Sequence, residues 1–252
     1  AYVFVSMYLW YGLPLFACVL ITIAVTLVMY QLTMFLILVC KIPDMLATCA
    51  LMFVHQGLGQ WYIGGGAVST GMRTPAGAQP VRIKLEPSFS AIGKEPWLII
   101  IMLVCVLIAH IFLEYTKHGR FIYAMGGNPE AARLAGVNIK KYRLAVFTIT
   151  GILAAVAGII MAARTGSAQP SAGASYPFDC MTAVVLGGVS FAGGSGSMLG
   201  AMMGVIIIGV LNNGMQLVGM DSNMINCVKG IVLLIAIGID SVQRTGKKAK
   251  KV

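Results

Sequence analysis

The sequence predicts an all-α fold, a polytopic transmembrane helical bundle with broken or short helices around residues 179–213. The first observation behind this prediction is composition. Of the 252 residues, 58% are hydrophobic and only 10% are charged, whereas soluble domains average about 45–50% apolar and about 25% charged residues. The second observation is that the apolar residues form long runs, and mean hydropathy is +0.87. A soluble globule of 26.7 kDa would not keep a wettable surface with this composition.

Seven apolar segments are candidates for membrane-embedded helices. A spanning helix needs about 20 apolar residues, because the hydrocarbon core is about 30 Å thick and each residue adds about 1.5 Å. The candidates are Pro14–Val39, Met45–Tyr62, Trp97–Tyr115, Leu144–Ala163, Asp179–Ser190, Met198–Asn213 and Met224–Asp240. The fifth and sixth are short and a Gly/Ser-rich stretch separates them, so broken helices or half-helices are expected there.

The chain begins inside an apolar run. Tyr2–Trp10 has no basic segment before it and no small-residue cleavage site after it, so a signal peptide is not predicted. We expect this run to be the end of a helix whose start is missing. On this view residues 1–252 form a single, N-terminally truncated transmembrane domain.

Two long connections set the predicted orientation. Gly64–Pro96 is polar and carries four prolines, whereas Thr116–Arg143 is basic. Placing Thr116–Arg143 in the cytoplasm puts twelve Lys and Arg residues on that side and five on the other, which is the bias that cytoplasmic loops show. The sequence therefore predicts a multi-pass cell-membrane protein. Residues 116–143 form a cytoplasmic loop, and residues 241–252 form a basic cytoplasmic tail that either contacts anionic lipid or is solvated.

Several classes of site are not predicted. The net charge of +10 follows from the cytoplasmic excess, and no basic residues alternate with aromatic ones, so nucleic acid is not an expected partner. The six cysteines have no CxxC spacing, and the three histidines have no ligand partner at metal-binding spacing. There is no P-loop motif and no nucleophile–base pair. We therefore expect no metal, cofactor or catalytic residue.

One cytoplasmic segment predicts a short helix with defined ends, Pro129–Ala135. Asn128 is a good N-cap, and proline suits the first helical position. The charge of Glu130 complements the helix dipole in the first turn, and Gly136 is a natural stop.

This helix is expected to meet another protein. A connection between two spans does not need a capped helix of small residues, and such a helix fits a groove on a partner. A connector helix lying on the membrane surface is the alternative. The exposed residues are expected to include Ala131, Ala132 and Ala135. The residues assigned to the contact are Asn128, Pro129, Glu130, Ala131, Ala132, Arg133 and Gly136.

The glycine-rich stretch after residue 192 is interpreted as a packing surface. Gly196, Gly200 and Gly204 are four residues apart, so they line one helix face and allow close helix approach. A nucleotide site is disfavoured because the spacing is G-x-G-x-x-x-G and no βαβ unit surrounds it.

Polar residues within the spans have two open interpretations. They either line a path for a polyol or hydrogen-bond a neighbouring helix. Asp179 and Lys229 lie near predicted outer ends of spans and are expected to extend towards the membrane interface. The candidates for the path are Gln31, Asn212, Asn213 and Gln216.

The segment Arg120–Val137, which reads RFIYAMGGNPEAARLAGV, resembles the cytoplasmic coupling loop of ABC sugar-importer permeases of the ribose/galactose/xylose type. Weaker similarity begins near Lys41-Ile-Pro43. The chain departs from the family pattern at Thr33-Met34, where Asn-Gly is usual, and at Pro177, where Glu is usual. Further similar segments, in the family's order, are ARTGSAQP at 163–170, AVVLGG at 183–188, GGSGSMLG at 193–200 and NG at 213–214.

The resemblance implies the permease subunit of an ATP-driven importer for a monosaccharide or a similar small polar solute. It implies ATP-binding ABC subunits that each receive Pro129–Ala135, a second permease subunit as homo- or heterodimer, and a periplasmic or lipid-anchored solute-binding protein. The binding protein is expected to dock on surfaces such as Gly64–Pro96 and Gly166–Pro177. The alternatives are a permease for a nucleoside or a quorum-signal furanose, an ion-coupled secondary transporter, and an integral membrane enzyme or scaffold.

Overall fold

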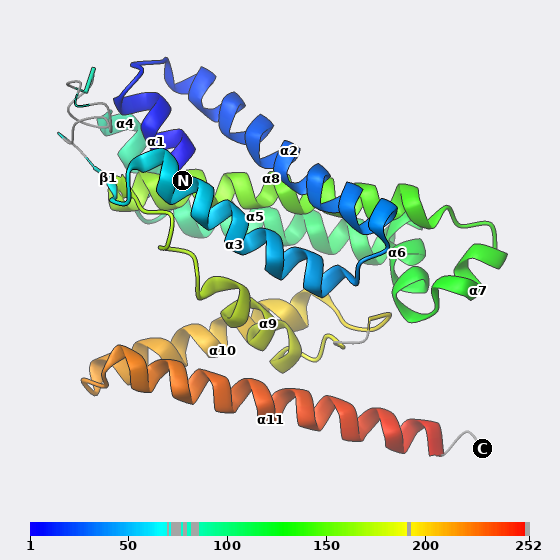
Figure 1. Cartoon of the computed structure of the whole chain (residues 1–252). Coiled ribbons are helices and arrows are strands. Elements are labelled where there is room, and N and C mark those ends of the chain that lie inside the picture. The colour runs from blue at the N-terminus through cyan, green and yellow to red at the C-terminus, as the bar shows by residue number, and fades with distance from the viewer. Residues whose placement is uncertain (70, 72–76, 78–79, 82–85, 191–192, 250–252) are drawn as a thin grey trace. The chain divides into compact units, whose positions relative to one another are not determined.

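The computed structural model describes residues 1–69, 71, 77, 80–81, 86–190 and 193–249, and nearly all of its regular structure is helical (Figure 1). Two short strands, β1 (Val68–Ser69) and β2 (Ser167–Ala168), form an antiparallel pair. The helices in chain order are α1 (Tyr2–Leu9), α2 (Leu15–Cys40), α3 (Asp44–Ile63), α4 (Pro87–Ile92), α5 (Trp97–His110), the π-helix η1 (Ile111–Tyr115), α6 (Lys117–Gly127), α7 (Pro129–Leu134), α8 (Ile139–Thr165), α9 (Tyr176–Leu186), α10 (Met198–Leu217) and α11 (Ser222–Ala249).

Five of the described helices are long and apolar enough to cross a membrane, which confirms the predicted all-α polytopic class. They are Leu15–Cys40, Trp97–Tyr115, Ile139–Thr165, Met198–Leu217 and Ser222–Asp240. The predicted span Met45–Tyr62 forms α3, which is as long as α10 but is not among the five. Its polar residues His55, Gln56 and Gln60 lower its mean hydropathy.

The chain forms two compact units that alternate along the sequence. The first unit contains Ala1–Met102 and Lys140–Ala172, and the second contains Leu103–Ile139 and Gly173–Val252. The predicted cytoplasmic loop therefore belongs almost entirely to the second unit, together with α9, α10 and α11.

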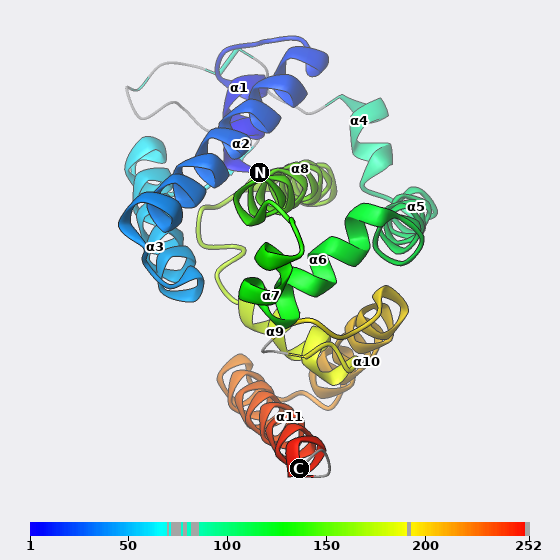
Figure 2. The ribbon, with the colours of Figure 1, turned by 90° about the vertical axis from the view of Figure 1, so that its right-hand side faces the viewer.

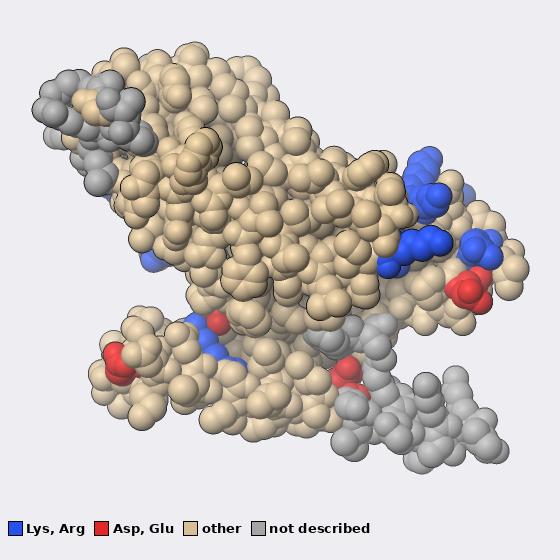
Figure 3. Space-filling view, viewed as in Figure 1, with Lys and Arg blue, Asp and Glu red and all other residues tan. Residues whose placement is uncertain are grey.

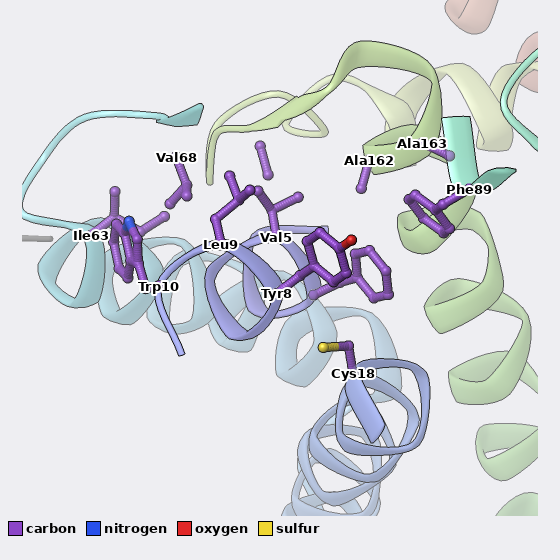
Figure 4. Packing of buried hydrophobic residues seen from close by; sticks show 12 residues of the cluster. Val5, Tyr8, Leu9, Trp10, Cys18, Ile63, Val68, Phe89, Ala162 and Ala163 are labelled. Carbon is purple, nitrogen blue, oxygen red and sulfur yellow. The ribbon is translucent and has the colours of Figure 1, made fainter. Parts of the chain in front are cut away.

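The core of the first unit is built around α1 (Figure 4). Phe4 and Leu9 have no exposed surface, and the ring centroid of Phe4 lies 4.7 Å from that of Phe89 in α4. The run that the sequence marked only as the end of a helix therefore organises this unit. The other members of the cluster are Val5, Tyr8, Trp10, Cys18, Ile63, Val68, Ala162, Ala163 and Ala168.

The strand pair joins two segments that the sequence assigned to the outer surface. Val68 pairs with Ala168, and Ser69 pairs with Ser167, so part of Gly64–Pro96 lies beside the start of the segment after α8. Positions 70, 72–76, 78–79 and 82–85 of the first segment are outside the described residues.

The helices of the second unit differ in length from the prediction. The expected short helix is α9, whose 11 residues extend about 16 Å, half of what a bilayer requires. In contrast, α10 is continuous and ends at Leu217 rather than Asn213. Asn and Gly each disfavour a helix interior by about 1 kcal/mol or less, which does not stop a helix that is already formed. The helix α11 continues beyond Asp240 to Ala249, and positions 250–252 lie outside the described residues.

Candidate functional site

The side chain of Asn128 fixes the start of α7. Its Oδ1 accepts hydrogen bonds from the backbone N–H groups of Glu130 at 3.0 Å and Ala131 at 3.1 Å. The backbone of Asn128 is extended, with φ −152° and ψ 99°, so the chain turns between α6 and α7 at this residue. Two of the N–H groups that a helix start leaves without partners are thereby satisfied.

The end of α7 is closed by a glycine in the left-handed region. Gly136 has φ +84°, its N–H donates to the carbonyl of Arg133 at 3.0 Å, and the N–H of Val137 donates to the carbonyl of Ala132 at 3.0 Å. These two bonds form a Schellman motif. The helix ends at Leu134, and Ala135, the last residue of the predicted helix, is its C-cap.

The exposed face of α7 differs from the predicted one at Ala132 and Leu134. Ala132 is 5% exposed and Val137 is 7% exposed, because the Schellman turn brings apolar residues at these two positions together. The expectation that Ala132 is exposed is therefore wrong. Leu134, which no sequence pattern marked as exposed, is 87% exposed. Leu134 thus exposes an apolar side chain beside the exposed Glu130 and Arg133. The helix that carries these three residues is fixed at both ends.

Helix α7 itself carries exposed charge. Glu130 and Arg133 are both exposed, and acidic and basic side chains are visible on the described surface in Figure 3. Most of the other described surface in this view is uncharged. The combination of a fixed helix, an exposed leucine and flanking charges is suited to a protein partner with a complementary cleft.

The end of α6, directly before α7, touches the connector between α9 and α10 through four glycines, which we call the glycine seam: Gly126, Gly127, Gly193 and Gly194. A Cβ added at Gly126 would lie 2.8 Å from the backbone N of Gly194, and one added at Gly193 would lie 2.6 Å from the carbonyl O of Gly126. Gly193 and Gly194 have φ +86° and +77°. Both views place this connector beside α6 and α7 (Figure 1, Figure 2). The end of α6 and the connector therefore meet backbone to backbone at these four glycines.

The same connector is bonded to α11. The hydroxyl of Ser190 donates to the Asp240 carboxylate, with both oxygens at 3.2 Å. Within the connector, the N–H of Ser190 donates to the carbonyl of Ser195 at 2.9 Å. The connector that touches the end of α6 is therefore also bonded to α11 through Ser190.

Two of the three glycines predicted to line a helix face lie between α10 and α9. A Cβ at Gly204 would collide with the carbonyl O of Ala183, and one at Gly200 would collide with the carbonyl O of Gly187. Gly196 does not share this face, because it precedes the helix and has φ +142°. A Cβ there would lie 2.8 Å from Val189.

The four polar residues considered for a solute path have different surroundings. Gln31, in the first unit, donates from Nε2 to the hydroxyl of Thr148 at 2.7 Å, which is a bond between α2 and α8. The other three lie on α10 in the second unit. Asn213 and Gln216 are exposed, whereas the Oδ1 atom of Asn212 is buried and has no hydrogen-bond partner among the described residues.

The two charged residues expected to extend to the interface form an ion pair. Lys229 Nζ lies 3.0 Å from Asp179 Oδ2, and an opposite charge on a neighbouring helix lowers the cost of a charge in an apolar segment. Among the residues that the structure describes, no group of three His, Cys, Asp or Glu side chains is placed to hold a metal ion.

Comparison with known proteins identifies similar sequences. A family model described as "Branched-chain amino acid transport system / permease component" matches residues 1–237. The ribose import permease protein RbsC of Escherichia coli K12 is 39% identical over 204 residues, which are 80% of this chain and 61% of that protein. The RbsC protein of Bacillus subtilis strain 168 is 39% identical over 205 residues, or 79% and 60% of the two chains.

A permease protein of a xylose transport system is also similar. The xylose transport system permease protein XylH of Escherichia coli K12 is 43% identical over 146 residues, which are 58% of this chain and 37% of that protein. The chain spans about three fifths of the length of the ribose permeases it matches. No solved structure matches the chain. The resemblance that the segment Arg120–Val137 indicated is confirmed by these relatives.

Proposed function

Because the chain belongs to the family of branched-chain amino acid transport system permease components, we propose that it is the membrane permease subunit of an ATP-driven importer. The solute is a monosaccharide or a similar small polar molecule. The relatives named for ribose and xylose make a pentose the first candidate. The chain supplies the path and the mechanical coupling, and separate subunits bind and hydrolyse ATP.

The single observation that carries this proposal is the exposed, doubly capped helix α7. Asn128 and Gly136 fix both ends, and Leu134 is 87% exposed. We assign this face to a cleft on the ATP-binding subunit. When the ATP-binding subunits close, α7 moves with them as a rigid body, and the glycine seam transmits the displacement to α9–α11.

The proposed assembly contains further partners. Two permease subunits form the path, two ATP-binding subunits dock beneath them, and a periplasmic or lipid-anchored binding protein delivers the solute. The protein lies in the cell (inner) membrane, in contact with its lipid, with α7 and the C-terminus in the cytoplasm. The excess of Lys and Arg in 116–143 and 241–252 supports this orientation.

The test is ATP-dependent uptake of D-ribose and D-xylose by the complete transporter, with Leu134→Glu and Leu134→Met as a matched pair. A carboxylate in an apolar cleft is strongly unfavourable, whereas methionine preserves the apolar contact. We expect Leu134→Glu to lose co-purification of the ATP-binding subunit and to lower uptake about tenfold or more. Leu134→Met is expected to stay near the wild-type rate.

Normal uptake and solute-stimulated ATP hydrolysis with Leu134→Glu would contradict the docking role. Energy depletion separates the transport classes. Uptake that survives loss of ATP but stops with an ionophore would favour an ion-coupled secondary transporter instead.

A further inference from the structure

Two charged side chains are paired within the apolar part of the second unit. Lys229 of α11 donates from Nζ to Asp179 Oδ2 of α9 at 3.0 Å. Lys229 lies about 10 Å along α11 from its first residue, Ser222, inside the stretch Ser222–Asp240 that is long and apolar enough to span a membrane. Charged groups at such positions are costly, and they usually mark a solute or ion pathway.

The ion pair leaves most of its hydrogen-bonding capacity unused. An ammonium group has three N–H donors and a carboxylate has two acceptor oxygens. In the described part of the chain, the only hydrogen bond of this pair joins Nζ to Oδ2. The side chains of Lys229 and Asp179 are 18% and 20% exposed, so the remaining donors and acceptors are not sealed by protein.

The side-chain amide of Asn212, on the neighbouring helix α10, adds a hydrogen-bond acceptor to which no described residue donates. The helices α10 and α11 are in contact and are joined by the short turn 218–221. Asn212 lies about 8 Å along α10 from the last residue before this turn, and Lys229 lies about 10 Å beyond the first residue after it. Asn212 Oδ1 is buried and has no partner among the described residues. Because a buried acceptor without a donor is unfavourable, a donor from outside the chain would satisfy it.

We propose that Asp179 and Lys229, with Asn212 on the adjoining helix, form a contact site for the hydroxyl groups of the transported solute. A hydroxyl group both donates and accepts hydrogen bonds, so a neutral polyol engages the carboxylate and the ammonium group together. A charged solute would instead compete with one member of the pair. This inference depends on the transport function proposed above, and it identifies residues that the solute meets.

The test uses the complete transporter and measures KM and maximal rate for D-ribose uptake, with the amount of permease in the membrane and the bound ATP-binding subunit as folding checks. Asp179→Asn removes the charge but keeps the shape. We expect its KM to rise about tenfold with little change in maximal rate, the ratio typical of losing one hydrogen bond to a charged group.

Exchanging the two charges distinguishes a pair that contacts the solute from an ion pair that only holds α9 and α11 together. In the double variant Asp179→Lys with Lys229→Asp the ion pair can reform, but the donors and acceptors exchange places. We expect normal membrane abundance with a KM that stays raised. The matched control is the exchange Asp44→Arg with Arg143→Asp, which acts on an ion pair of 3.4 Å in the first unit. Its KM is expected to equal that of the wild type.

The outcomes are distinct. A wild-type KM in the exchange variant, or in both Asp179→Asn and Lys229→Arg, overturns the proposal and leaves the pair as a tie between α9 and α11. If Asp179→Asn does not reach the membrane, Lys229→Arg decides, since it retains the charge but changes the size of the group and the number and geometry of its donors. A wild-type transporter that carries no pentose would overturn the proposed solute and this site together. Pentose uptake that is insensitive to these residues would overturn only the site.

Discussion

Gly204 and Gly209 lie five positions apart on α10 and have opposite surroundings. A Cβ at Gly204 would collide with the carbonyl O of Ala183, whereas nothing lies within 4 Å of one at Gly209. We expect Gly204→Ala to destabilise the protein by about 1–3 kcal/mol, because extra volume forces α9 and α10 apart. Gly209→Ala should stabilise it by up to about 1 kcal/mol through helix propensity. Thermal unfolding of the detergent-solubilised protein measures both.

The two substitutions are chemically identical, so each controls for the other. Equal melting temperatures for the two variants would contradict the close packing of α9 on α10. A loss of stability with Gly209→Ala would instead indicate a contact at that face, such as a second permease subunit.

Residues whose role is local were predictable from sequence, and residues whose role depends on distant partners were not. Asn128 and Gly136 act on backbone groups within a few residues of themselves, so the sequence around Pro129 was sufficient to predict both as caps of the helix. Asp179 and Lys229 are 50 positions apart, and nothing in either segment indicates the other. Ala132 and Leu134 were misjudged or missed because the buried face of a six-residue helix is set by the turn that follows it.

At the scale of elements, adjacent glycines at the end of α6 provide a test of the glycine seam. A Cβ at Gly126 would lie 2.8 Å from the backbone N of Gly194, whereas one at Gly127 would lie 3.7 Å from the nearest atom, the Cα of Gly194. The first distance requires the backbone to move, and the second is an ordinary van der Waals contact. We expect Gly126→Ala to lower D-ribose uptake about tenfold while the ATP-binding subunit stays bound. Gly127→Ala should transport normally.

The informative measurement is the number of ATP molecules hydrolysed per ribose transported. If the seam carries the motion of α7 to α9–α11, this ratio rises in Gly126→Ala, because hydrolysis continues while transport fails. A parallel fall in hydrolysis and uptake would place the defect in docking and would contradict transmission through the seam.

The ends of helices were predicted correctly where the apolar runs are long. They were predicted wrongly where the packing of neighbouring elements decides where a helix ends. The spans Pro14–Val39 and Trp97–Tyr115 agree with the helices within about one residue, because hydropathy alone defines them. The end of α10 was misplaced because its polar residues remain helical. The glycine seam was not predicted, although the doublets Gly126-Gly127 and Gly193-Gly194 are visible in the sequence. Their meeting depends on the packing of α6 against the connector.

For the whole molecule, composition was sufficient to predict the fold class, since 58% hydrophobic residues exclude a soluble globule. The division into two compact units was not predictable. It arises because the chain leaves the first unit at residue 102 and returns to it at residue 140. Residue 102 lies inside an apolar run and residue 140 lies inside the predicted cytoplasmic loop, so neither coincides with a predicted element boundary.

Orientation is the remaining whole-molecule prediction, and it follows from charge. The predicted side that holds Thr116–Arg143 carries twelve Lys and Arg residues, and the opposite side carries five. Moving such a basic loop across the membrane is unfavourable. We expect Leu134→Cys to be protected from a membrane-impermeant maleimide in intact spheroplasts and labelled after permeabilisation. Val81→Cys, in the predicted outer connection and exposed like Leu134, should be labelled in both conditions.

Both variants are made in a chain whose six native cysteines are replaced by serine or alanine, and residual D-ribose uptake verifies that the background is folded. Side-chain accessibility is high at both positions in the chain, and labelling is done on the permease expressed without the ATP-binding subunit, which would otherwise cover position 134. A difference in labelling therefore reports the membrane barrier rather than burial. Labelling of Leu134→Cys in intact spheroplasts would place α7 outside the cell. No ATP-binding subunit could then reach it, and the coupling role of the capped helix would be excluded together with the orientation.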